Sequence, residues 1–195
     1  MNFVEPIRDR KKISQIKNLL RGQRRFRDLL LFTVGINTAL RISDILQLQV
    51  GDFIDETGRI RSRFWIKEEK RNKRHEVVVN DSIREALEDY LAEYPSIATT
   101  PERPLFFNSR RNGFDMPISR GQAWKFISQI AHEVGLHGNF GTHTLRKTWG
   151  YHARLNGVDL ALIMHKLKHN SLAYTKRYLG ITDDELEAVV RRLNL

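Results

Sequence analysis

Residues 26–48 read FRDLLLFTVGINTALRISDILQL, and this stretch decides the fold. Residues 26–40 are nearly all apolar, which predicts a helix that is buried on most sides. Arg41 follows at once, and Ser43 or Asp44 can cap a second apolar helix behind it. The sequence therefore predicts an arginine at the junction between two apolar helices.

Helical patterns continue on both sides of this junction. Apolar residues repeat at helical spacing from residue 13 onward, and that helix is expected to stop at Gly22. Ser82 with Glu85, and Ser119 with Gln122, have the spacing of capping boxes at helix starts. Further helices are predicted over residues 144–155, 159–168, 171–179 and from 182 onward.

One segment between the helices has the character of two strands. Residues 59–66 and 75–79 are predicted to pair as an antiparallel hairpin, whose tip at 67–74 reads KEEKRNKR. The expected fold is therefore mainly α with a small antiparallel β-sheet. No repeat and no low-complexity stretch divides the chain, so residues 1–195 are interpreted as a single domain.

The composition narrows the class of partner. The 195 residues include 33 Lys+Arg and 23 Asp+Glu, for a formal net charge of +10. This excess favours a polyanionic partner, either nucleic acid or an anionic membrane surface. No apolar run approaches the roughly 20 residues of a membrane span, which favours nucleic acid. The chain has no cysteine, which excludes disulfides, thiol nucleophiles and thiolate metal sites and is typical of a cytoplasmic protein.

Several residues have the chemistry needed to move a phosphoryl group onto a protein hydroxyl. That reaction needs cations on the non-bridging oxygens, a base for the nucleophile and an acid for the leaving oxygen. His143 and Arg146 share one helical face, and His169 lies at a predicted helix break shortly before Tyr178. Each residue alone also fits an ordinary role, such as a packed tyrosine ring or a solvated histidine. No Gly-rich phosphate loop is present, and His165 with His169 lacks a third ligand at metal spacing, so neither a cofactor nor a metal is expected.

Together these residues resemble the motifs of the tyrosine recombinase, or phage integrase, family. Residues 38–44 (TALRISD) resemble its first arginine box, residues 141–146 (GTHTLR) its His-Xaa-Xaa-Arg box, and residues 167–171 (LKHNS) its later histidine motif. Tyr178 falls at the family's nucleophile spacing. The resemblance runs from about residue 7 to the C-terminus and covers the family's catalytic domain. It implies the tyrosine recombinase catalytic-domain fold over residues 1–195. The N-terminal core-binding domain that family members commonly carry is not expected in this chain, which leaves three interpretations: a minimal recombinase, a DNA clamp supplied by a partner, or a fragment of a longer protein.

The resemblance implies a role for each residue of the set. Tyr178 would attack the scissile phosphate and become linked to it as a 3′-phosphotyrosine. Arg41 and Arg146 would hold the non-bridging oxygens. His143 would assist the deprotonation of Tyr178, and His169 would hydrogen-bond the phosphate. This chemistry needs neither a metal ion nor ATP.

The family's catalytic lysine lies in a β-hairpin loop, which draws attention to the charged tip. A family pattern of Lys-Xaa-Xaa-Lys before an apolar strand is matched by KRNK, from Lys70 to Lys73, ahead of residues 77–79. Lys70 is the predicted general acid for the departing 5′-oxygen, with Lys73 as the alternative. Two residues depart from the family pattern: Val78 replaces the usual proline, and Lys168 stands where glycine is more common. Lys168 is expected to alter the loop and to leave the chemistry intact.

These features predict a site-specific DNA recombinase or integrase, an enzyme that breaks and rejoins strands of double-stranded DNA. The resemblance implies a homotetramer on DNA, with residues 183–195 either reaching a neighbouring copy or packing on their own domain, and it leaves a monomer open for the free protein. The expected location is the cytoplasm, in association with the nucleoid and not with a membrane. Two alternatives are a type IB topoisomerase and a catalytically silent DNA-binding regulator. His143 counts against the first, because the topoisomerase family usually has a different residue at this position. The silent regulator is disfavoured because all six predicted catalytic residues are present together.

Overall fold

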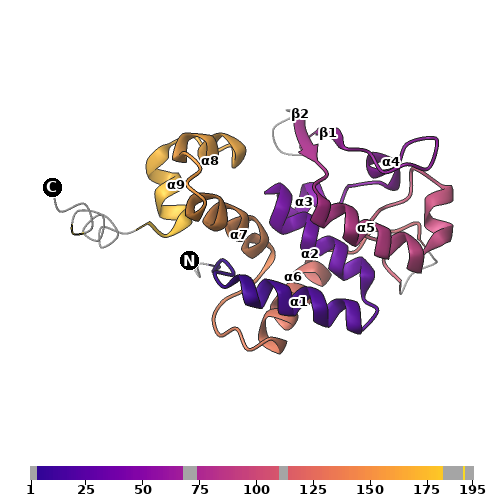
Figure 1. Ribbon diagram of the computed structural model, residues 1–195, viewed down its shortest axis with the longest axis horizontal. Coiled ribbons are helices and arrows are strands. Elements are labelled where there is room, and N and C mark those ends of the chain that lie inside the picture. Colours follow the sequence, from indigo (N-terminus) through magenta and orange to yellow (C-terminus); the bar gives the residue numbers. More distant parts are fainter. Residues whose placement is uncertain (1–3, 68–73, 110–113, 182–190, 192–195) are drawn as a thin grey trace.

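The computed structural model describes residues 4–67, 74–109, 114–181 and 191. Figure 1 shows a largely helical molecule with a two-stranded sheet at one edge. In chain order the elements are α1 (Arg10–Gly22), α2 (Phe26–Thr38), α3 (Ile42–Ile45), α4 (Val50–Phe53), β1 (Arg63–Lys67), β2 (Arg74–Val78), α5 (Asp81–Glu93), the 3-10 helix η1 (Pro95–Thr99), α6 (Arg120–Glu133), α7 (Thr142–Leu155), α8 (Leu160–Lys166) and α9 (Leu172–Leu179). The expected fold class is confirmed. Along the described stretches, no helix is both long and apolar enough to cross a membrane.

The helix α2 lies at the centre of the fold and packs against α1, α5 and α7 (Figure 1). Every side chain from residue 29 to 34 is at most 1% exposed, as the nearly continuous apolar sequence predicts. At Gly35 the helix comes very close to α7, because a Cβ atom there would lie 2.3 Å from Cδ1 of Leu145. This close contact fixes the position of α7, which carries His143 and Arg146, against the core.

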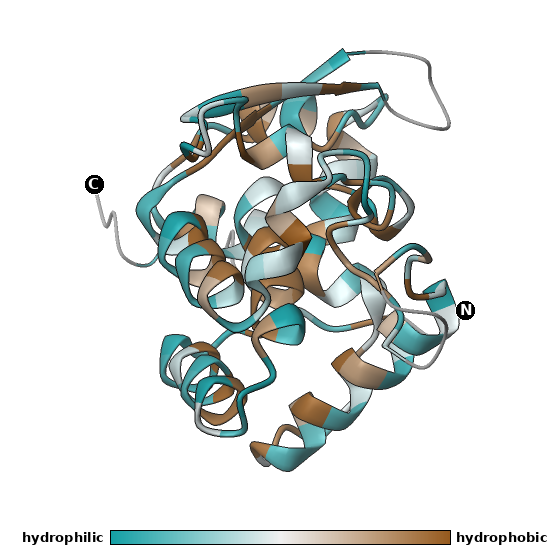
Figure 2. Ribbon diagram, turned by 90° about the vertical axis from the view of Figure 1, so that its right-hand side faces the viewer, coloured by the Kyte–Doolittle hydropathy of each residue, from teal (hydrophilic) through white to brown (hydrophobic). Residues whose placement is uncertain are grey.

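The apolar surfaces of the helices face one another across this core, as Figure 2 shows by the brown residues turned inward and the teal residues outside. The helix α2 ends at Thr38, whereas the sequence predicted residue 40. The reason is that Ala39 takes the left-handed conformation, with a φ of 59°, which interrupts a right-handed helix. The chain therefore turns just before Arg41.

The predicted hairpin is confirmed, but its first strand starts later than expected. The strands pair antiparallel from Arg63 opposite Val78 to Lys67 opposite Arg74. Residues 59–62 lie outside this sheet because the chain there pairs with the segment after α4, where Ile60 forms a bridge with Ile54. Phe64 and Val77 are buried and face the core.

A smaller apolar cluster joins α7, α8 and α9 next to the main core. Ile163 of α8, Leu167 behind it and Leu179 of α9 are buried together with Ala39. A Cβ atom at Gly150 of α7 would lie 2.7 Å from Cδ2 of Leu179, so α9 packs closely on α7. Because a helix as short as α9 has little stability of its own, this packing is what holds it in place.

Most predicted helix starts are confirmed, but two predicted caps are wrong. The helix α3 begins directly behind Arg41, so Ser43 and Asp44 lie inside it. The helix α5 begins at residue 81 because the side chain of Asn80 accepts a hydrogen bond from a backbone amide of the first turn, so that Ser82 lies inside the helix. Asparagine caps helices as well as serine does, and here it comes first along the chain. The helix predicted from residue 182 onward lies outside the described residues.

Candidate active site

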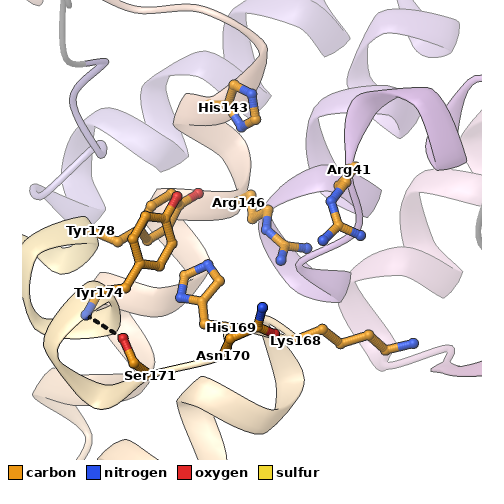
Figure 3. Close-up of a pocket in the computed structure, with 9 residues that line it drawn as sticks. All are labelled: Arg41, His143, Arg146, Lys168, His169, Asn170, Ser171, Tyr174 and Tyr178. Carbon is orange, nitrogen blue, oxygen red and sulfur yellow. Dashed lines mark hydrogen bonds between the residues drawn. The ribbon is translucent and has the colours of Figure 1, made fainter. Parts of the chain in front are cut away.

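A cavity of about 410 Å³ opens where the junction between α2 and α3 meets α7 and α9 (Figure 3). It is lined by Arg41, His143, Arg146, Lys168, His169, Asn170, Ser171, Tyr174 and Tyr178. The structure therefore brings five of the six predicted catalytic residues to one place. The sixth, Lys70, and its alternative Lys73 lie outside the described residues.

Figure 3 shows how the side chains enter the cavity. Tyr174 and Tyr178 lie on one side and Arg41 on the other, with Arg146 and His169 between them. Since these residues come from the start of α3, from α7 and from the segment around α9, the cavity forms only when the core and the smaller apolar cluster pack together. The cations and the hydroxyl then face a common space.

Arg146 is buried, with only 5% of its surface exposed, whereas Arg41 and Lys168 are half-buried. Its guanidinium donates hydrogen bonds to the backbone carbonyl oxygens of Ala39 and Leu167. Those carbonyls lie where the chain leaves α2 and α8, so one side chain ties three segments together. A carbonyl oxygen orients the guanidinium without cancelling its formal charge, which remains available for an anion.

Arg41 lies at the junction between α2 and α3, as the sequence predicted. Its backbone is extended, with φ −72° and ψ 150°, and its side chain is half-buried. The left-handed turn at Ala39 and this extended residue together direct the guanidinium toward Arg146, as Figure 3 shows. Two guanidinium groups that face one cavity suit an anion with two non-bridging oxygens, such as a phosphodiester.

His143 lies one helical turn before Arg146, at the start of α7. Partial burial lowers its pKa, and the nearby cations, first among them Arg146, lower it further. An ordinary histidine titrates near pH 6.5, so this imidazole is neutral at pH 7 and carries a lone pair that can accept a proton. The residue is suited to act as a base.

His169 follows α8 on a loop that Lys168 turns by adopting the left-handed conformation, with φ 49°. Glycine takes this conformation without a steric penalty, which explains why glycine is more common than lysine at this position of the family motif. The ammonium of Lys168 donates a hydrogen bond of 3.4 Å to the carbonyl oxygen of Arg74 in β2. The substitution thus keeps the turn and adds a link to the hairpin.

The ring of His169 is held by neighbours on α9. Its Nδ1 atom lies 3.1 Å from the hydroxyl of Thr175. Its ring centre lies 4.6 Å from that of Tyr174 and 4.8 Å from that of Tyr178, both in edge-to-face geometry. These contacts leave one ring nitrogen pointing into the space between Tyr178 and Arg146 (Figure 3).

Tyr178 lies near the end of α9 with its ring half-buried and its hydroxyl oxygen buried. Burial raises the pKa of this hydroxyl to about 12, although the charge of Arg146 opposes the shift. The ammonium of Lys147 lies 5.0 Å from the ring centre, at cation–π distance. The hydroxyl is therefore protonated at neutral pH and needs a base before it can attack.

Two cavity neighbours were not singled out from the sequence. Tyr174 lies one turn before Tyr178, and that spacing alone could have placed both rings on one face. Thr175 contacts His169 from the buried side of α9, and its polarity at a buried position gave no local signal. Within the described ranges, no group of three His, Cys, Asp or Glu side chains is arranged to hold a metal ion.

Comparison with known proteins identifies a family. Residues 9–185 match the model of the Phage integrase family. The probable integrase/recombinase YoeC of Bacillus subtilis is 37% identical over 191 residues, which make up 98% of this chain and 97% of that protein. The tyrosine recombinase XerD of Corynebacterium glutamicum is 29% identical over 168 residues, or 85% of this chain and 52% of that protein. The chain thus spans nearly all of the first relative and about half of the second.

Solved recombinase structures have the same fold. The crystal structure of XerA recombinase superposes with a TM-score of 0.75 at 20% identity, over 98% of this chain and 66% of that one. XerH site-specific recombinase, in a post-cleavage complex with its palindromic difH substrate, gives a TM-score of 0.71 at 20% identity, over 99% of this chain and 54% of that one. The predicted tyrosine recombinase catalytic-domain fold is confirmed.

Proposed function

Because the chain belongs to the phage integrase family, we propose that it is a site-specific recombinase that breaks and rejoins double-stranded DNA. One observation carries the proposal: Tyr178 shares a single cavity with two arginines and two histidines. The net charge of +10 supports a polyanionic substrate. DNA is also the ligand of XerH and of a lambda integrase dimer among the structures with this fold.

In the proposed reaction one phosphoester is exchanged for another. The phenolic oxygen of Tyr178 attacks the phosphorus of a DNA phosphodiester, and the bond from phosphorus to the 5′-oxygen breaks. The strand is left joined to the tyrosine through its 3′-phosphate, and the 5′-oxygen takes up a proton and leaves as a hydroxyl. Because the new bond is again a phosphoester, a 5′-hydroxyl from another strand can reverse the step without ATP.

The proton of Tyr178 passes to His143. A phenol whose pKa is about 12 does not ionise by itself at pH 7, so its proton must be transferred as the attack proceeds. The lowered pKa of His143 keeps the imidazole neutral and ready to accept that proton. Positive charge from Arg146 favours the developing phenolate.

Arg41 and Arg146 bind the two non-bridging oxygens, and His169 donates a further hydrogen bond. Arg146 is already fixed by two carbonyl oxygens, so it needs no reorganisation when negative charge builds up on the phosphate. Such preorganised donors typically lower the barrier by about 3–4 kcal/mol each. The cations therefore supply electrostatic stabilisation, while the tyrosine supplies the new bond.

Lys70 acts as the general acid in this proposal, with Lys73 as the alternative. Both belong to the segment between β1 and β2, whose flanking residues Lys67 and Arg74 are paired across the hairpin. The carbonyl oxygen of Arg74 accepts a hydrogen bond from Lys168, which lines the cavity. General acid catalysis of this kind is typically worth about 10²–10⁴-fold.

We further propose that the chain works as one catalytic domain and assembles as a homotetramer on two DNA sites. The support is the chemistry itself, because exchange between two duplexes requires four cleaved strands and each protein copy carries one Tyr178. We also propose that the protein associates with the nucleoid, because its proposed substrate is DNA. Sedimentation with and without a DNA site would test the assembly.

The test of the function is a covalent adduct on nicked, labelled DNA drawn from the regions that flank the gene. The natural protein is expected to form a detergent-stable protein–DNA adduct, and Tyr178→Phe is expected to form none. Tyr174→Phe is the matched control, because it deletes a hydroxyl from the same cavity one helical turn away and should still give the adduct. An adduct that persists in Tyr178→Phe would refute the assignment of the nucleophile. Relaxation of a supercoiled plasmid without strand exchange would show a topoisomerase instead.

A further inference from the structure

The buried hydroxyl of Thr175 is the feature of the site that the proposed chemistry leaves unexplained. Thr175 is fully buried on α9, and it does not line the cavity. Its Oγ1 atom lies 3.1 Å from Nδ1 of His169 and 3.0 Å from the carbonyl oxygen of Ser171. Any effect of this hydroxyl on the reaction must therefore be exerted through the imidazole of His169.

We infer that Thr175 is a positioning residue, which holds His169 so that its Nε2 atom presents a hydrogen to the scissile phosphate. The inference rests on the proposed function, since it concerns how one residue of that site is made ready for the substrate. Thr175 contacts the ring at Nδ1, on the side away from the cavity. Figure 3 shows the opposite ring nitrogen directed into the space between Tyr178 and Arg146.

The hydrogen-bonding capacity of a hydroxyl explains why threonine suits this position. A phosphate oxygen accepts hydrogen bonds and cannot donate them, so Nε2 must carry a hydrogen. In a neutral imidazole this requires Nδ1 to be an acceptor, whereas in an imidazolium Nδ1 is a donor. A hydroxyl serves both forms, because it donates to the neutral ring and accepts from the charged one. A carbonyl or carboxylate partner could only accept, and it would hold the neutral ring with no hydrogen on Nε2.

The contact between Thr175 and Ser171 does not prevent this behaviour. Threonine hydroxyls in helices commonly donate to the carbonyl four residues earlier. Here that carbonyl oxygen also accepts a hydrogen bond of 3.1 Å from the backbone amide of Thr175. The hydroxyl can therefore turn its hydrogen toward Nδ1 of His169 without leaving the Ser171 carbonyl unpaired.

The aromatic neighbours of His169 complete the arrangement. Tyr174 and Tyr178 contact the ring edge-to-face at 81° and 76°, which limits the tilt of the imidazole plane. Such contacts restrain the plane of the ring but do not decide which nitrogen carries a hydrogen. When the hydroxyl of Thr175 donates its hydrogen to Nδ1, that nitrogen is an acceptor, and the hydrogen of the neutral ring lies on Nε2.

The test is a double-mutant cycle on the rate of adduct formation with the nicked DNA substrate. Thr175→Val keeps the shape and removes the hydroxyl, and it is expected to slow the reaction by about 10-fold, the value of one hydrogen bond. Thr175→Ser retains the hydroxyl and should stay within about 3-fold of the natural rate. In a His169→Ala background, Thr175→Val should add less than about 2-fold, because the residue through which it acts is gone.

The results of this cycle distinguish a positioning role of Thr175 from a merely structural one. A Thr175→Val penalty of equal size in both backgrounds, or a Thr175→Ser variant as slow as Thr175→Val, would show a merely structural role and overturn the inference. If Thr175→Val does not fold, as judged by thermal unfolding, Thr175→Ala takes its place in the same cycle. If the natural protein forms the adduct but the effects of Thr175→Val and His169→Ala on its rate are additive, this inference is wrong and the proposed function stands. Absence of any adduct from the natural protein would overturn the proposed function, and this inference with it.

Discussion

Replacing Arg146 by lysine tests whether one side chain both assembles the cavity and binds the phosphate. Lysine keeps the positive charge and much of the length of arginine, but it has one ammonium in place of a planar fork. In the structure two different nitrogens of Arg146 donate to two carbonyl oxygens, those of Ala39 and Leu167. A single ammonium cannot occupy both positions, so at least one buried carbonyl loses its charged donor.

The size of the effect follows from those two hydrogen bonds. A hydrogen bond to a charged group contributes about 1.5–3 kcal/mol to stability. Loss of one bond at a side chain that is 5% exposed should therefore lower the free energy of unfolding by about 2 kcal/mol. The adduct rate should fall by about 10²–10³-fold, because one preorganised donor to the developing charge is lost.

The assay combines urea unfolding, followed by far-UV circular dichroism, with adduct formation on nicked DNA. Arg41→Lys is the matched control, because Arg41 points into the same cavity from a half-buried position. It should slow the adduct comparably and change the unfolding free energy by less than about 1 kcal/mol. An Arg146→Lys variant that unfolds within about 0.5 kcal/mol of the natural protein would refute the structural part of this reasoning.

Four further predictions concern pH, the general acid, the loop before His169 and salt. Because the pKa of His143 is lowered, the adduct rate should stay level down to about pH 6.5 and decrease only at more acid pH, as His143 gains a proton; a profile measured between about pH 5 and 8 should lose that decrease in His143→Gln. Lys70→Ala should slow cleavage by about 10²–10⁴-fold and recover on a substrate whose 5′-oxygen is replaced by sulfur, which leaves without protonation; recovery of Lys73→Ala instead would transfer the role to Lys73. Lys168→Gly should be more stable to urea than Lys168→Ala by about 1 kcal/mol, since glycine alone takes a φ of 49° without a steric cost, and equal stabilities would contradict this. DNA affinity measured by fluorescence anisotropy should fall by about 10-fold or more between about 50 and 200 mM salt, and a flat response would argue against phosphate contacts.

The five residues that the structure brings into one cavity could be predicted because their signals are local. Arg41 follows closely on a largely apolar helix, His143 and Arg146 share a helical turn, and Tyr178 follows His169 at a spacing typical of the family. Short-range patterns of this kind depend on residues that are neighbours along the chain. They predicted most of the helices, the hairpin and the five cavity residues that the structure describes, but not α4 or η1.

Local patterns were wrong at two element boundaries, where the sequence offered more than one choice. The first strand starts at residue 63 because Ile60 pairs with Ile54 instead of with the hairpin. The cap of α5 is Asn80, although Ser82 has the better-known capping-box spacing. In both cases several local choices were compatible with the sequence, and the structure adopts one that the pattern did not favour.

The sequence by itself determined most of the elements and the candidate residues for the chemistry, because periodicity, capping and motif order are properties of adjacent residues. Only the tertiary structure decided how those residues are held. The carbonyl partners of Arg146 lie 107 and 21 positions away along the chain, and the hydroxyl that contacts His169 comes from the next helix. Such pairings depend on the simultaneous packing of α2, α7, α8 and α9, and no local pattern encodes the distances that this packing sets.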